Sequence, residues 1–298
     1  MPRWSHVKST IVRAAPPLLL APLSRLTPVL AARIAARLWF TIPPGSRSGT
    51  DVGHGAPFTV AVDGRAVRGA LWGDGPVVYL VHGWAGSCRQ MAPLVGPLVA
   101  AGYRVVAFDG PSHGRSDPGP SGPGRSHAVE FANALAAVAG VHGPARAVVA
   151  HSMGAMATMV TLRLGLLSTE RLVFVAPMHE LRSYLDRFAD ALRLGRRARR
   201  RLDADLEARV GMAVEDFDLL GMAGAATAPL LIVHDQGDRR LAWAESVALV
   251  ERWPRTATLV STTGLGHSRL LADPAVHQEI VDFVAGDRAA VGHGRSGG

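Results

Sequence analysis

The clearest pattern along the chain is a series of short, continuous apolar runs separated by longer segments with helical spacing of apolar residues. Strands that alternate with helices in this way indicate parallel βαβ units, in which each strand is buried on both faces. The runs predict strands at 76–83, 103–110, 145–151, 171–177, 228–235 and 257–262. The segments between and after them predict helices at 90–102, 127–140, 153–167, 242–253 and 274–286.

A different rhythm precedes the first buried run. Residues 58–64 (FTVAVDG) alternate apolar and polar side chains, and the alternation resumes in 65–73 (RAVRGALWG). The Asp-Gly pair between them is a strong turn signal. We therefore predict an antiparallel hairpin at the start of a mostly parallel sheet.

The N-terminal residues 1–50 are apolar but interrupted by prolines and arginines, and no uncharged run reaches the roughly 20 residues that a membrane-spanning helix needs. Their resemblance to a signal peptide is weak, because adjacent prolines break the short apolar core. Residues 28–40 predict an amphipathic helix with a proline at its start. It is interpreted as packing on its own domain, lying on an anionic membrane surface, or docking a partner. The recurring apolar positions are Leu30, Ile34 and Leu38.

Length and composition suit one large α/β domain. The chain has 298 residues, of which 48% are hydrophobic and 19% charged. Cys88 is the single cysteine, which excludes an internal disulfide framework and a cysteine-based zinc site. The histidine spacing suggests no metal site either. We divide the chain into an extension (1–50), an α/β domain (51–286) that contains a lid insertion (178–227), and a disordered tail (287–298).

The charge balance is basic, with a formal net charge of +8, and the basic residues are nearly all arginines. They cluster once, at 193–202 (RLGRRARRRL), inside the lid insertion. A solvated outer face is the default interpretation, and attraction to an anionic membrane or to an anionic substrate such as an acyl-CoA is the alternative. Nucleic-acid binding is not expected from one short run without interleaved aromatic residues.

Reactive groups in an open parallel sheet gather beyond the carboxyl ends of the strands. Ser152 follows one predicted strand, Asp235 and Asp238 end and follow another, and His267 comes shortly after the last. Serine, acid and histidine in this chain order are what a hydrolase triad on such a sheet requires. A serine hydroxyl needs a base to take its proton and a carboxylate to orient that base.

Ser152 by itself is ambiguous, because a serine before a helix is usually an N-cap. The nucleophile turn has the pattern G-x-S-x-G, and Ala150 stands where the first glycine is expected. Alanine is the next smallest residue, and Gly154 supplies the second glycine. The surrounding constellation favours a nucleophile.

Taken together, five segments resemble the α/β-hydrolase superfamily, from about Pro57 to about Gly286. They are HGWAG (82–86), FDGPSHGRSD (108–117), AHSMGA (150–155), LLIVHDQGD (230–238) and GLGHSRLL (264–271). The resemblance implies an α/β-hydrolase fold, with a mostly parallel central sheet, helices on both faces and a small helical lid. It also implies that Ser152 is the nucleophile, His267 the base and Asp238 the acid, with Asp235 and then Glu180 as the alternative acids.

The same resemblance implies an oxyanion hole formed by the backbone N–H groups of Trp84 and Met153. His82, Gly83 and His151 are expected beside the substrate, with His82 orienting its loop. Asp109 and His113 are expected to shape the neighbouring loop.

Serine at the nucleophile turn sets the chain apart from the epoxide hydrolases and haloalkane dehalogenases of the superfamily, which carry aspartate there. We therefore expect a cofactor-free serine hydrolase that cleaves a small carboxylic ester through an acyl-enzyme, like a carboxylesterase or lipase. Thioesterase, acyltransferase and haloperoxidase-type perhydrolase activities stay open, as does a non-catalytic binding protein on this scaffold. The expected location is the cytoplasm rather than outside the cell, with peripheral membrane contact through residues 28–40 and the arginine-rich lid.

Overall fold

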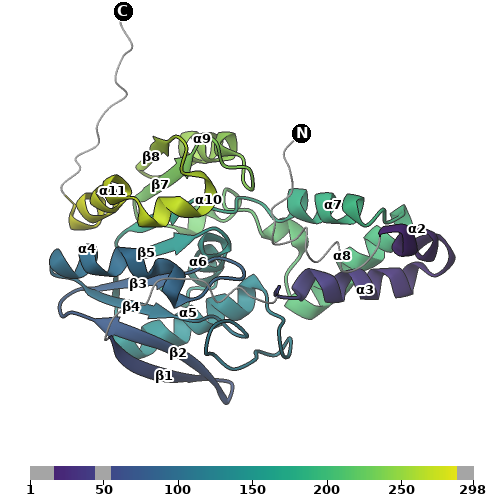
Figure 1. Cartoon of the computed structure of the whole chain (residues 1–298), viewed down its shortest axis with the longest axis horizontal. Coiled ribbons are helices and arrows are strands. Elements are labelled where there is room, and N and C mark those ends of the chain that lie inside the picture. Colours follow the sequence, from purple (N-terminus) through teal and green to yellow (C-terminus); the bar gives the residue numbers. More distant parts are fainter. Residues whose placement is uncertain (1–16, 44–54, 287–298) are drawn as a thin grey trace, which may run out of the picture.

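The computed structural model describes residues 17–43 and 55–286, so the predictions for 1–16, for most of the 49–57 linker and for the tail at 287–298 lie outside the described residues. Figure 1 shows a sheet domain with helices on both faces and a helical cap that projects from one side of it. The helices of the cap are α2 (Pro17–Leu26), α3 (Pro28–Phe40), α7 (Arg182–Ala191) and α8 (Arg196–Val210).

The described part of the sheet has eight strands in the order β1-β2-β4-β3-β5-β6-β7-β8. Strands β1, β2 and β4 pair antiparallel, and all the other neighbours pair parallel. The predicted hairpin and mostly parallel sheet are confirmed. The strands are β1 (Ala56–Val62), β2 (Arg65–Trp72), β3 (Val77–Val81), β4 (Arg104–Phe108), β5 (Ala145–His151), β6 (Leu172–Val175), β7 (Leu230–Asp235) and β8 (Ala257–Thr262).

Two apolar clusters cover the two faces of the sheet, which is why its central strands are mainly apolar on both faces. One cluster includes side chains of α5 (Ala128–His142), α6 (Met153–Arg163) and α9 (Trp243–Arg252). The other includes side chains of α4 (Val95–Ala100) and α11 (Pro274–Ala285). Strand β8 is half-exposed, as expected for the edge of the sheet.

The prediction of a single helix at 90–102 is wrong, because the structure has two shorter helical segments there. A 3₁₀ segment, η1 (Cys88–Leu94), comes first and contains Pro93, and α4 is a short helix after it. Proline has no N–H to give to a helical hydrogen bond and clashes with the preceding turn, so the helix begins again after Pro93. The end predicted at Gly102 agrees with its positive φ of 87°.

The cap has its own apolar core, which joins the N-terminal helices to the lid insertion. Small side chains on one side of α3 let it pack closely against α8. They are Ala31, Ala32, Ala35 and Ala36. Trp39 packs edge-on against Phe188 of α7, with ring centroids 5.1 Å apart. The extension and the insertion, which the sequence analysis treats separately, are therefore one packed unit, and residues 28–40 pack on their own chain. Among the described residues, no helix has the length and apolar content to cross a membrane.

Candidate active site

Ser152 lies on a strained turn between β5 and α6. Its φ of 54° and ψ of −119° place a non-glycine residue in a sparsely populated region, which costs on the order of 1–3 kcal/mol. Its side chain makes no capping hydrogen bond to α6. The N-cap interpretation of Ser152 therefore does not describe this turn, and its hydroxyl is directed elsewhere.

The turn is packed so closely that Gly154 tolerates no side chain. A Cβ there would lie 2.6 Å from the carbonyl oxygen of Val81 and 2.8 Å from that of His82. Ala150, in contrast, has its methyl group wholly buried in the core. The close approach at this turn is thus at the second glycine position of the pattern, and the first position accommodates alanine.

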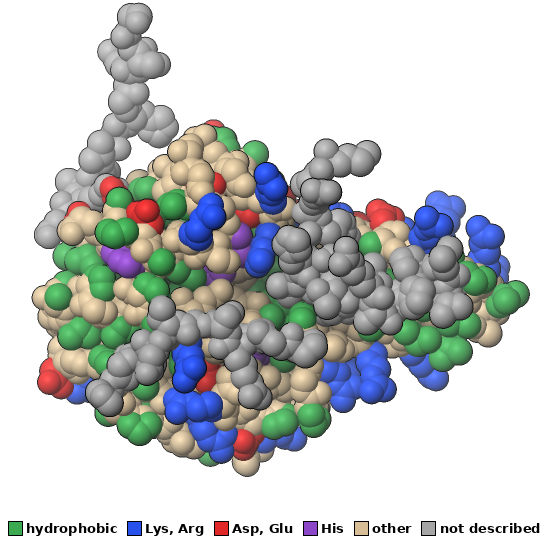
Figure 2. Space-filling view, in the orientation of Figure 1, with side chains coloured by type: hydrophobic (Ala, Val, Ile, Leu, Met, Phe, Trp, Pro, Cys, Tyr) green, Lys and Arg blue, Asp and Glu red, His purple; other side chains and the backbone are tan. Residues whose placement is uncertain are grey.

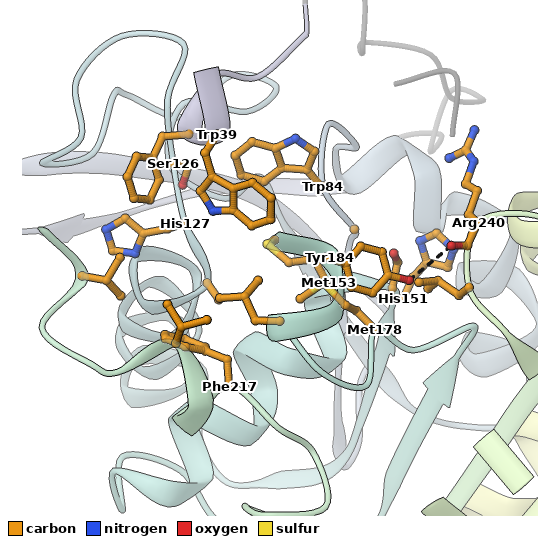
Figure 3. A pocket seen from close by; sticks show the side chains of 18 of the residues that line it. Trp39, Trp84, Ser126, His127, His151, Met153, Met178, Tyr184, Phe217 and Arg240 are labelled. Carbon is orange, nitrogen blue, oxygen red and sulfur yellow. Dashed lines mark hydrogen bonds between the residues drawn. The ribbon is translucent and has the colours of Figure 1, made fainter. Parts of the chain in front are cut away.

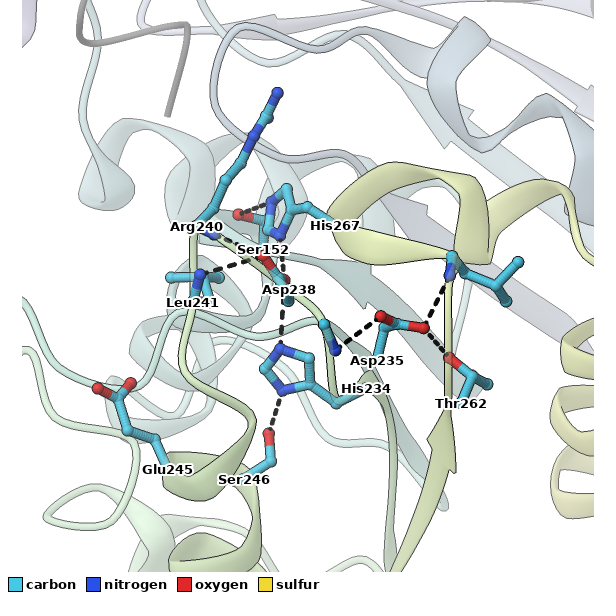
Figure 4. Close-up of polar contacts among 12 residues, drawn as sticks. Ser152, His234, Asp235, Asp238, Arg240, Leu241, Glu245, Ser246, Thr262 and His267 are labelled. Carbon is cyan, nitrogen blue, oxygen red and sulfur yellow. Dashed lines mark hydrogen bonds and ion pairs between the residues drawn. The ribbon is translucent and has the colours of Figure 1, made fainter. Parts of the chain in front are cut away.

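Ser152, His267 and Asp238 meet although they are far apart in the sequence (Figure 4). His267 Nε2 lies 3.2 Å from Ser152 Oγ, and His267 Nδ1 lies 2.7 Å from Asp238 Oδ2. His267 is in α10 (Gly266–Arg269), and Asp238 is in the loop after β7. The structure brings together the serine, base and acid predicted from the sequence.

Asp238 is anchored on both carboxylate oxygens. Oδ1 accepts hydrogen bonds from the backbone N–H groups of Arg240 and Leu241, at 2.7 and 3.2 Å. Oδ2 is shared by His267 and His234. Burial alone would raise the pKa of Asp238, but the hydrogen bonds from the two histidines outweigh it and hold that pKa well below its usual range. Asp238 is therefore an anion at neutral pH.

His267 is neutral at the same pH. Burial lowers its pKa below the ordinary histidine value, and the opposing effect of Asp238 does not cancel this. Because Asp238 accepts the hydrogen on Nδ1, Nε2 is left with a lone pair toward Ser152. This is the protonation state that a base for the serine hydroxyl needs.

The two alternative acids are engaged elsewhere. Asp235 accepts hydrogen bonds from Thr262 Oγ1 and the backbone N–H groups of Gly237 and Leu265, at 2.8 to 2.9 Å. It thus ties the loops after β7 and β8 together. Glu180 is exposed and accepts a hydrogen bond from Ser183 at 2.7 Å.

The predicted oxyanion donors are available. Within the described residues, no hydrogen bond is assigned to the backbone N–H of either Trp84 or Met153. Both residues line the cavity beside Ser152. Ala85, next to Trp84, has a φ of 59°, so the loop after β3 is held in an uncommon backbone conformation at this point.

Of the three residues expected beside the substrate, Gly83 and His151 line the cavity and His82 does not. His82 is wholly buried, donates from Nδ1 to the carbonyl of Gly83 and accepts at Nε2 from the N–H of Gly110. Its two ring nitrogens thus connect the loop after β3 to the loop after β4, as buried polar atoms need hydrogen-bond partners. His151 donates from Nε2 to the backbone carbonyl of His267 at 3.0 Å. Burial, with the nearness of His267, lowers the pKa of His151 to about 3.

Asp109 and His113 shape the neighbouring loop as expected. Asp109 accepts hydrogen bonds from the backbone N–H groups of Cys88 and Arg115, at 2.7 and 2.9 Å. His113 accepts one from the N–H of Ala85 at 3.2 Å, and burial, with the neighbouring His82, lowers its pKa to about 3. Both side chains fix the backbone around the cavity.

The cavity beside Ser152 has a volume of about 160 Å³ and lies between the sheet domain and the cap (Figure 3). Its polar lining side chains include Ser126, which donates to Glu130, and His127, which accepts from the N–H of the same residue. The rest of the lining is mainly apolar and includes Trp39, Phe40, Trp84, Met178, Leu206 and Phe217. Among the described residues, no group of histidine, cysteine and acidic side chains is arranged to hold a metal ion.

Sequence reasoning missed several residues of this site. Trp39 and Phe40 line the cavity, but the periodicity of residues 28–40 points to Leu30, Ile34 and Leu38 instead. Of these three, Leu30 is 49% exposed. Arg240 lines the cavity, with its guanidinium directed away from the apolar side chains in Figure 3. His234 was visible only as the start of the turn that carries Asp238. No local sequence signal distinguishes these residues from ordinary core or loop residues.

Comparison with known proteins agrees with this architecture. Residues 78–291 match the model of the alpha/beta hydrolase family. A non-heme haloperoxidase from Rhodococcus erythropolis is 35% identical over 98 residues, which cover 33% of this chain and 35% of that protein. A putative carbamate hydrolase, RutD, from Variovorax paradoxus (strain S110) is 26% identical over 71% of this chain and 92% of its own length.

The fold is also found among solved structures. Est1E from Butyrivibrio proteoclasticus, solved with ferulic acid bound, superposes with a TM-score of 0.57 at 17% identity, over 77% of this chain and 97% of its own. The chain spans only about a third of the first curated relatives it matches, the haloperoxidase and a serine hydrolase-like protein from Danio rerio. The family match covers well over half of the chain, and the chain belongs to the alpha/beta hydrolase family.

Proposed function

We propose that this member of the alpha/beta hydrolase family is a serine hydrolase that cleaves a carboxylic ester without a cofactor. The observation that carries the proposal is the contact of His267 with both Ser152 Oγ and Asp238, at 3.2 and 2.7 Å. His267 takes the hydroxyl proton as Ser152 Oγ attacks the ester carbonyl, and then donates that proton to the departing alcohol. Water, deprotonated by His267, releases the acid from the acyl-enzyme.

The backbone N–H groups of Trp84 and Met153 are proposed to bind the oxyanion of the tetrahedral intermediate. One such donor typically contributes about 3 kcal/mol to transition-state stabilisation. Backbone donors survive side-chain substitution, so the indole of Trp84 is free to shape the cavity wall. The turn at Ser152 supports this role because Ser152 and Met153 are adjacent on it and both line the same cavity.

The apolar lining indicates an ester with an apolar acyl group. Trp39 from α3, Leu206 from α8 and Phe217 line one cavity with Met178 next to the sheet. Burying hydrocarbon there contributes roughly 0.8 kcal/mol per methylene. We therefore expect kcat/KM to rise with acyl chain length until the cavity is full, as in carboxylesterase and lipase-like enzymes.

Fluorophosphonate labelling tests the reaction class. The probe should label the wild type, and Ser152→Ala should abolish labelling while the thermal unfolding temperature stays unchanged. Equal labelling of the two proteins contradicts the assignment of Ser152. Absence of labelling in the wild type favours the non-catalytic binding protein.

A second activity is favoured by the match to a non-heme haloperoxidase. An acyl-enzyme on Ser152 reacts with hydrogen peroxide in place of water to give a peracid, as a perhydrolase does. Cleavage of a thioester substrate tests for thioesterase activity. Transfer of the acyl group to an added alcohol tests for acyltransferase activity. Product analysis with p-nitrophenyl esters, with and without each nucleophile, ranks these alternatives.

We also propose that the end of the cap contacts an anionic membrane surface, such as the cytoplasmic leaflet. Leu26, Val29 and Leu30 are 82%, 44% and 49% exposed at the corner between α2 and α3. Ser24 Oγ, on α2, accepts a hydrogen bond from the N–H of Gly195 at 3.1 Å, so this corner lies next to the arginine-rich start of α8. Figure 2 shows apolar and arginine side chains together at this end of the cap.

Sedimentation with phospholipid vesicles tests this contact. The wild type should bind phosphatidylglycerol vesicles more strongly than phosphatidylcholine vesicles. Replacing Leu26, Val29 and Leu30 by serine should remove most of that binding. The matched control replaces Leu164 and Leu166, which are 47% and 48% exposed, in the same way. Equal binding by the two variants contradicts the proposal.

A further inference from the structure

Arg240 brings a permanent positive charge to the cavity beside Ser152. It lines that cavity together with Ser152 and His267, and it is half-buried. Among the described residues, no aspartate, glutamate, lysine or second arginine belongs to the lining. Because a guanidinium stays protonated in proteins, the cavity has a charged part as well as an apolar part.

The backbone of Arg240 is fixed in the loop after β7. Its N–H donates to Asp238 Oδ1 at 2.7 Å, and its carbonyl accepts a hydrogen bond from the Tyr184 hydroxyl at 3.2 Å. The guanidinium differs from the backbone, because no hydrogen bond or ion pair is assigned to it within residues 17–43 and 55–286. The fold therefore holds the base of this side chain in place and leaves its charged end without a partner from the described chain.

Asp238 is close in the sequence, but its carboxylate has no acceptor site left for this guanidinium. A carboxylate offers about four lone-pair sites. The groups that occupy them are the backbone N–H groups of Arg240 and Leu241 and the rings of His234 and His267. The N–H donors of the Arg240 side chain are thus open to an anion that enters the cavity.

Arg240 lies at the end of the cavity from which the alcohol departs, if Ser152 is the nucleophile. In Figure 3, Arg240 lies at one end of the cavity, and Trp39 and Phe217 lie at the other. Burial chiefly lowers the pKa of His267, and the positive charge of Arg240 adds to this lowering, as expected for a cation close to the ring. His267 gives its proton to the departing alcohol, so the alcohol lies on the side of His267 and Arg240.

We propose that the substrate is an ester whose alcohol part carries a carboxylate or phosphate group, which the guanidinium of Arg240 binds. This inference deepens the proposed function and rests on it. The apolar acyl group lies at the end lined by Trp39 and Phe217, and the anionic alcohol lies at the end next to Arg240. A planar guanidinium forms paired N–H···O bonds with either anion. The anion takes no part in bond-making and leaves with the alcohol.

Two butyrate esters that differ in charge test the proposal. 3-Carboxyphenyl butyrate carries an anion on its alcohol part, and 3-carbamoylphenyl butyrate has a neutral group of nearly the same shape there. Both give the same butyryl-enzyme, so the ratio of their kcat/KM values compares only binding and departure of the alcohol. In the wild type, kcat/KM should be about tenfold higher for the anionic ester, which corresponds to about 1.4 kcal/mol.

Arg240→Gln should remove this preference and bring the two kcat/KM values to within about twofold of each other. Arg239→Gln is the matched control, because it removes the same charge from the preceding residue, which is exposed and does not line the cavity. The control should keep the tenfold preference. Each ratio is measured within one protein, so it does not depend on the fraction of folded enzyme. The same ratio in the wild type and Arg240→Gln overturns the proposal.

A third ester distinguishes the two anions. 3-(Phosphonooxy)phenyl butyrate places a phosphate where the first ester has a carboxylate. A higher kcat/KM for the phosphate ester identifies a phosphorylated alcohol, and a higher kcat/KM for the carboxylate ester identifies a carboxylated one. In both cases Arg240→Gln should remove the preference over the neutral ester. A preference that survives in Arg240→Gln for both anions assigns the anion to another group and overturns the role of Arg240.

Product binding separates this proposal from the proposed function, because it needs no turnover. In NMR titrations, 3-hydroxybenzoate should bind the wild type about tenfold more tightly than 3-hydroxybenzamide, and Arg240→Gln should bind the two equally. Equal binding by the wild type, with fluorophosphonate labelling of Ser152 intact, overturns the role of Arg240 and leaves the serine hydrolase in place. Preferential binding of the anion without labelling overturns the serine hydrolase and leaves the anion site.

Discussion

The two sides of the cavity differ in how their residues are held. On the sheet side, directional contacts of 2.7 to 3.2 Å connect Ser152, His267 and Asp238. On the cap side, Trp39 and Leu206 line the cavity with large apolar side chains. Bond-making requires atoms to be placed within a fraction of an ångström, whereas apolar burial depends mainly on area. We infer that the sheet carries the chemistry and the cap selects the substrate.

The largest effect should come from the sheet side. Ser152→Ala should lower kcat about a million-fold, because the members of such a set act as a unit. His267→Ala should lower it by a similar factor, and the double variant should be little worse. Steady-state kinetics on a short p-nitrophenyl ester measure this. A loss of less than a hundredfold for Ser152→Ala would place the chemistry elsewhere.

Substitutions that create a cavity in the core of the cap or in the core of the sheet domain should distinguish effects on stability from effects on catalysis. Leu202→Ala in α8 and Leu80→Ala in β3 both remove a wholly buried side chain and should each cost about 2–5 kcal/mol of unfolding free energy. Leu80→Ala should also lower kcat on a short ester, because β3 leads into the Trp84 loop. Denaturant unfolding and kinetics together measure this. Equal loss of kcat in both variants contradicts the inference that the sheet side carries the chemistry and the cap selects the substrate.

Trp39→Ala should change selectivity with little effect on the reaction itself. The indole lines the cavity from α3, so its loss should raise KM for long-chain esters roughly 10–100-fold, as expected for losing about 1.4–3 kcal/mol of apolar contact. Hydrolysis of the acetyl ester serves as the internal control and should stay within about twofold. A uniform fall across all chain lengths would mean that the cap is needed for the chemistry as well.

A smaller effect is expected on the pH profile of kcat/KM. His267 must be neutral to act as a base, and burial lowers its pKa. The acid limb of kcat/KM should therefore lie below pH 6.5, the ordinary histidine value, and activity should be lost as the pH falls through the lowered pKa of His267. A pH profile on an ester with a non-titrating leaving group measures this midpoint. A midpoint above 6.5 would mean that Asp238 outweighs burial.

Acid should also weaken the fold through histidines buried as neutral rings. The pKa of His113 is about 3 when folded and near 6.5 when unfolded, so its contribution to stability is complete above pH 6.5 and is lost as the pH falls toward 3. The slope is up to about 1.4 kcal/mol per pH unit. Denaturant unfolding measured from pH 7 to 4 gives the unfolding free energy at each pH. This free energy should fall more steeply with decreasing pH in the wild type than in His113→Gln, and equal slopes contradict this account.

Much of the sheet side was predictable because its signals are local. A buried parallel strand is mainly apolar, and the residue after it lies at the functional edge. Ser152, His267 and the pair of acids Asp235 and Asp238 therefore stood out by position and order. The break at Pro93 was also visible in principle, since proline disrupts helices wherever it occurs. Choosing Asp238 over Asp235 from the residues alone was not possible, because both follow the same strand and only their partners differ.

The sequence by itself determined the α/β architecture, the order of the strand-end residues and the identity of the family, because apolar periodicity and short polar motifs act over a few residues. Only the tertiary structure decided that α3 packs on α8 and lines the cavity with Trp39. Apolar surfaces from distant segments can pair in many ways, and no motif specifies which pair will form. The contact of His234 with the carboxylate oxygen of Asp238 that also binds His267 was likewise decided in three dimensions.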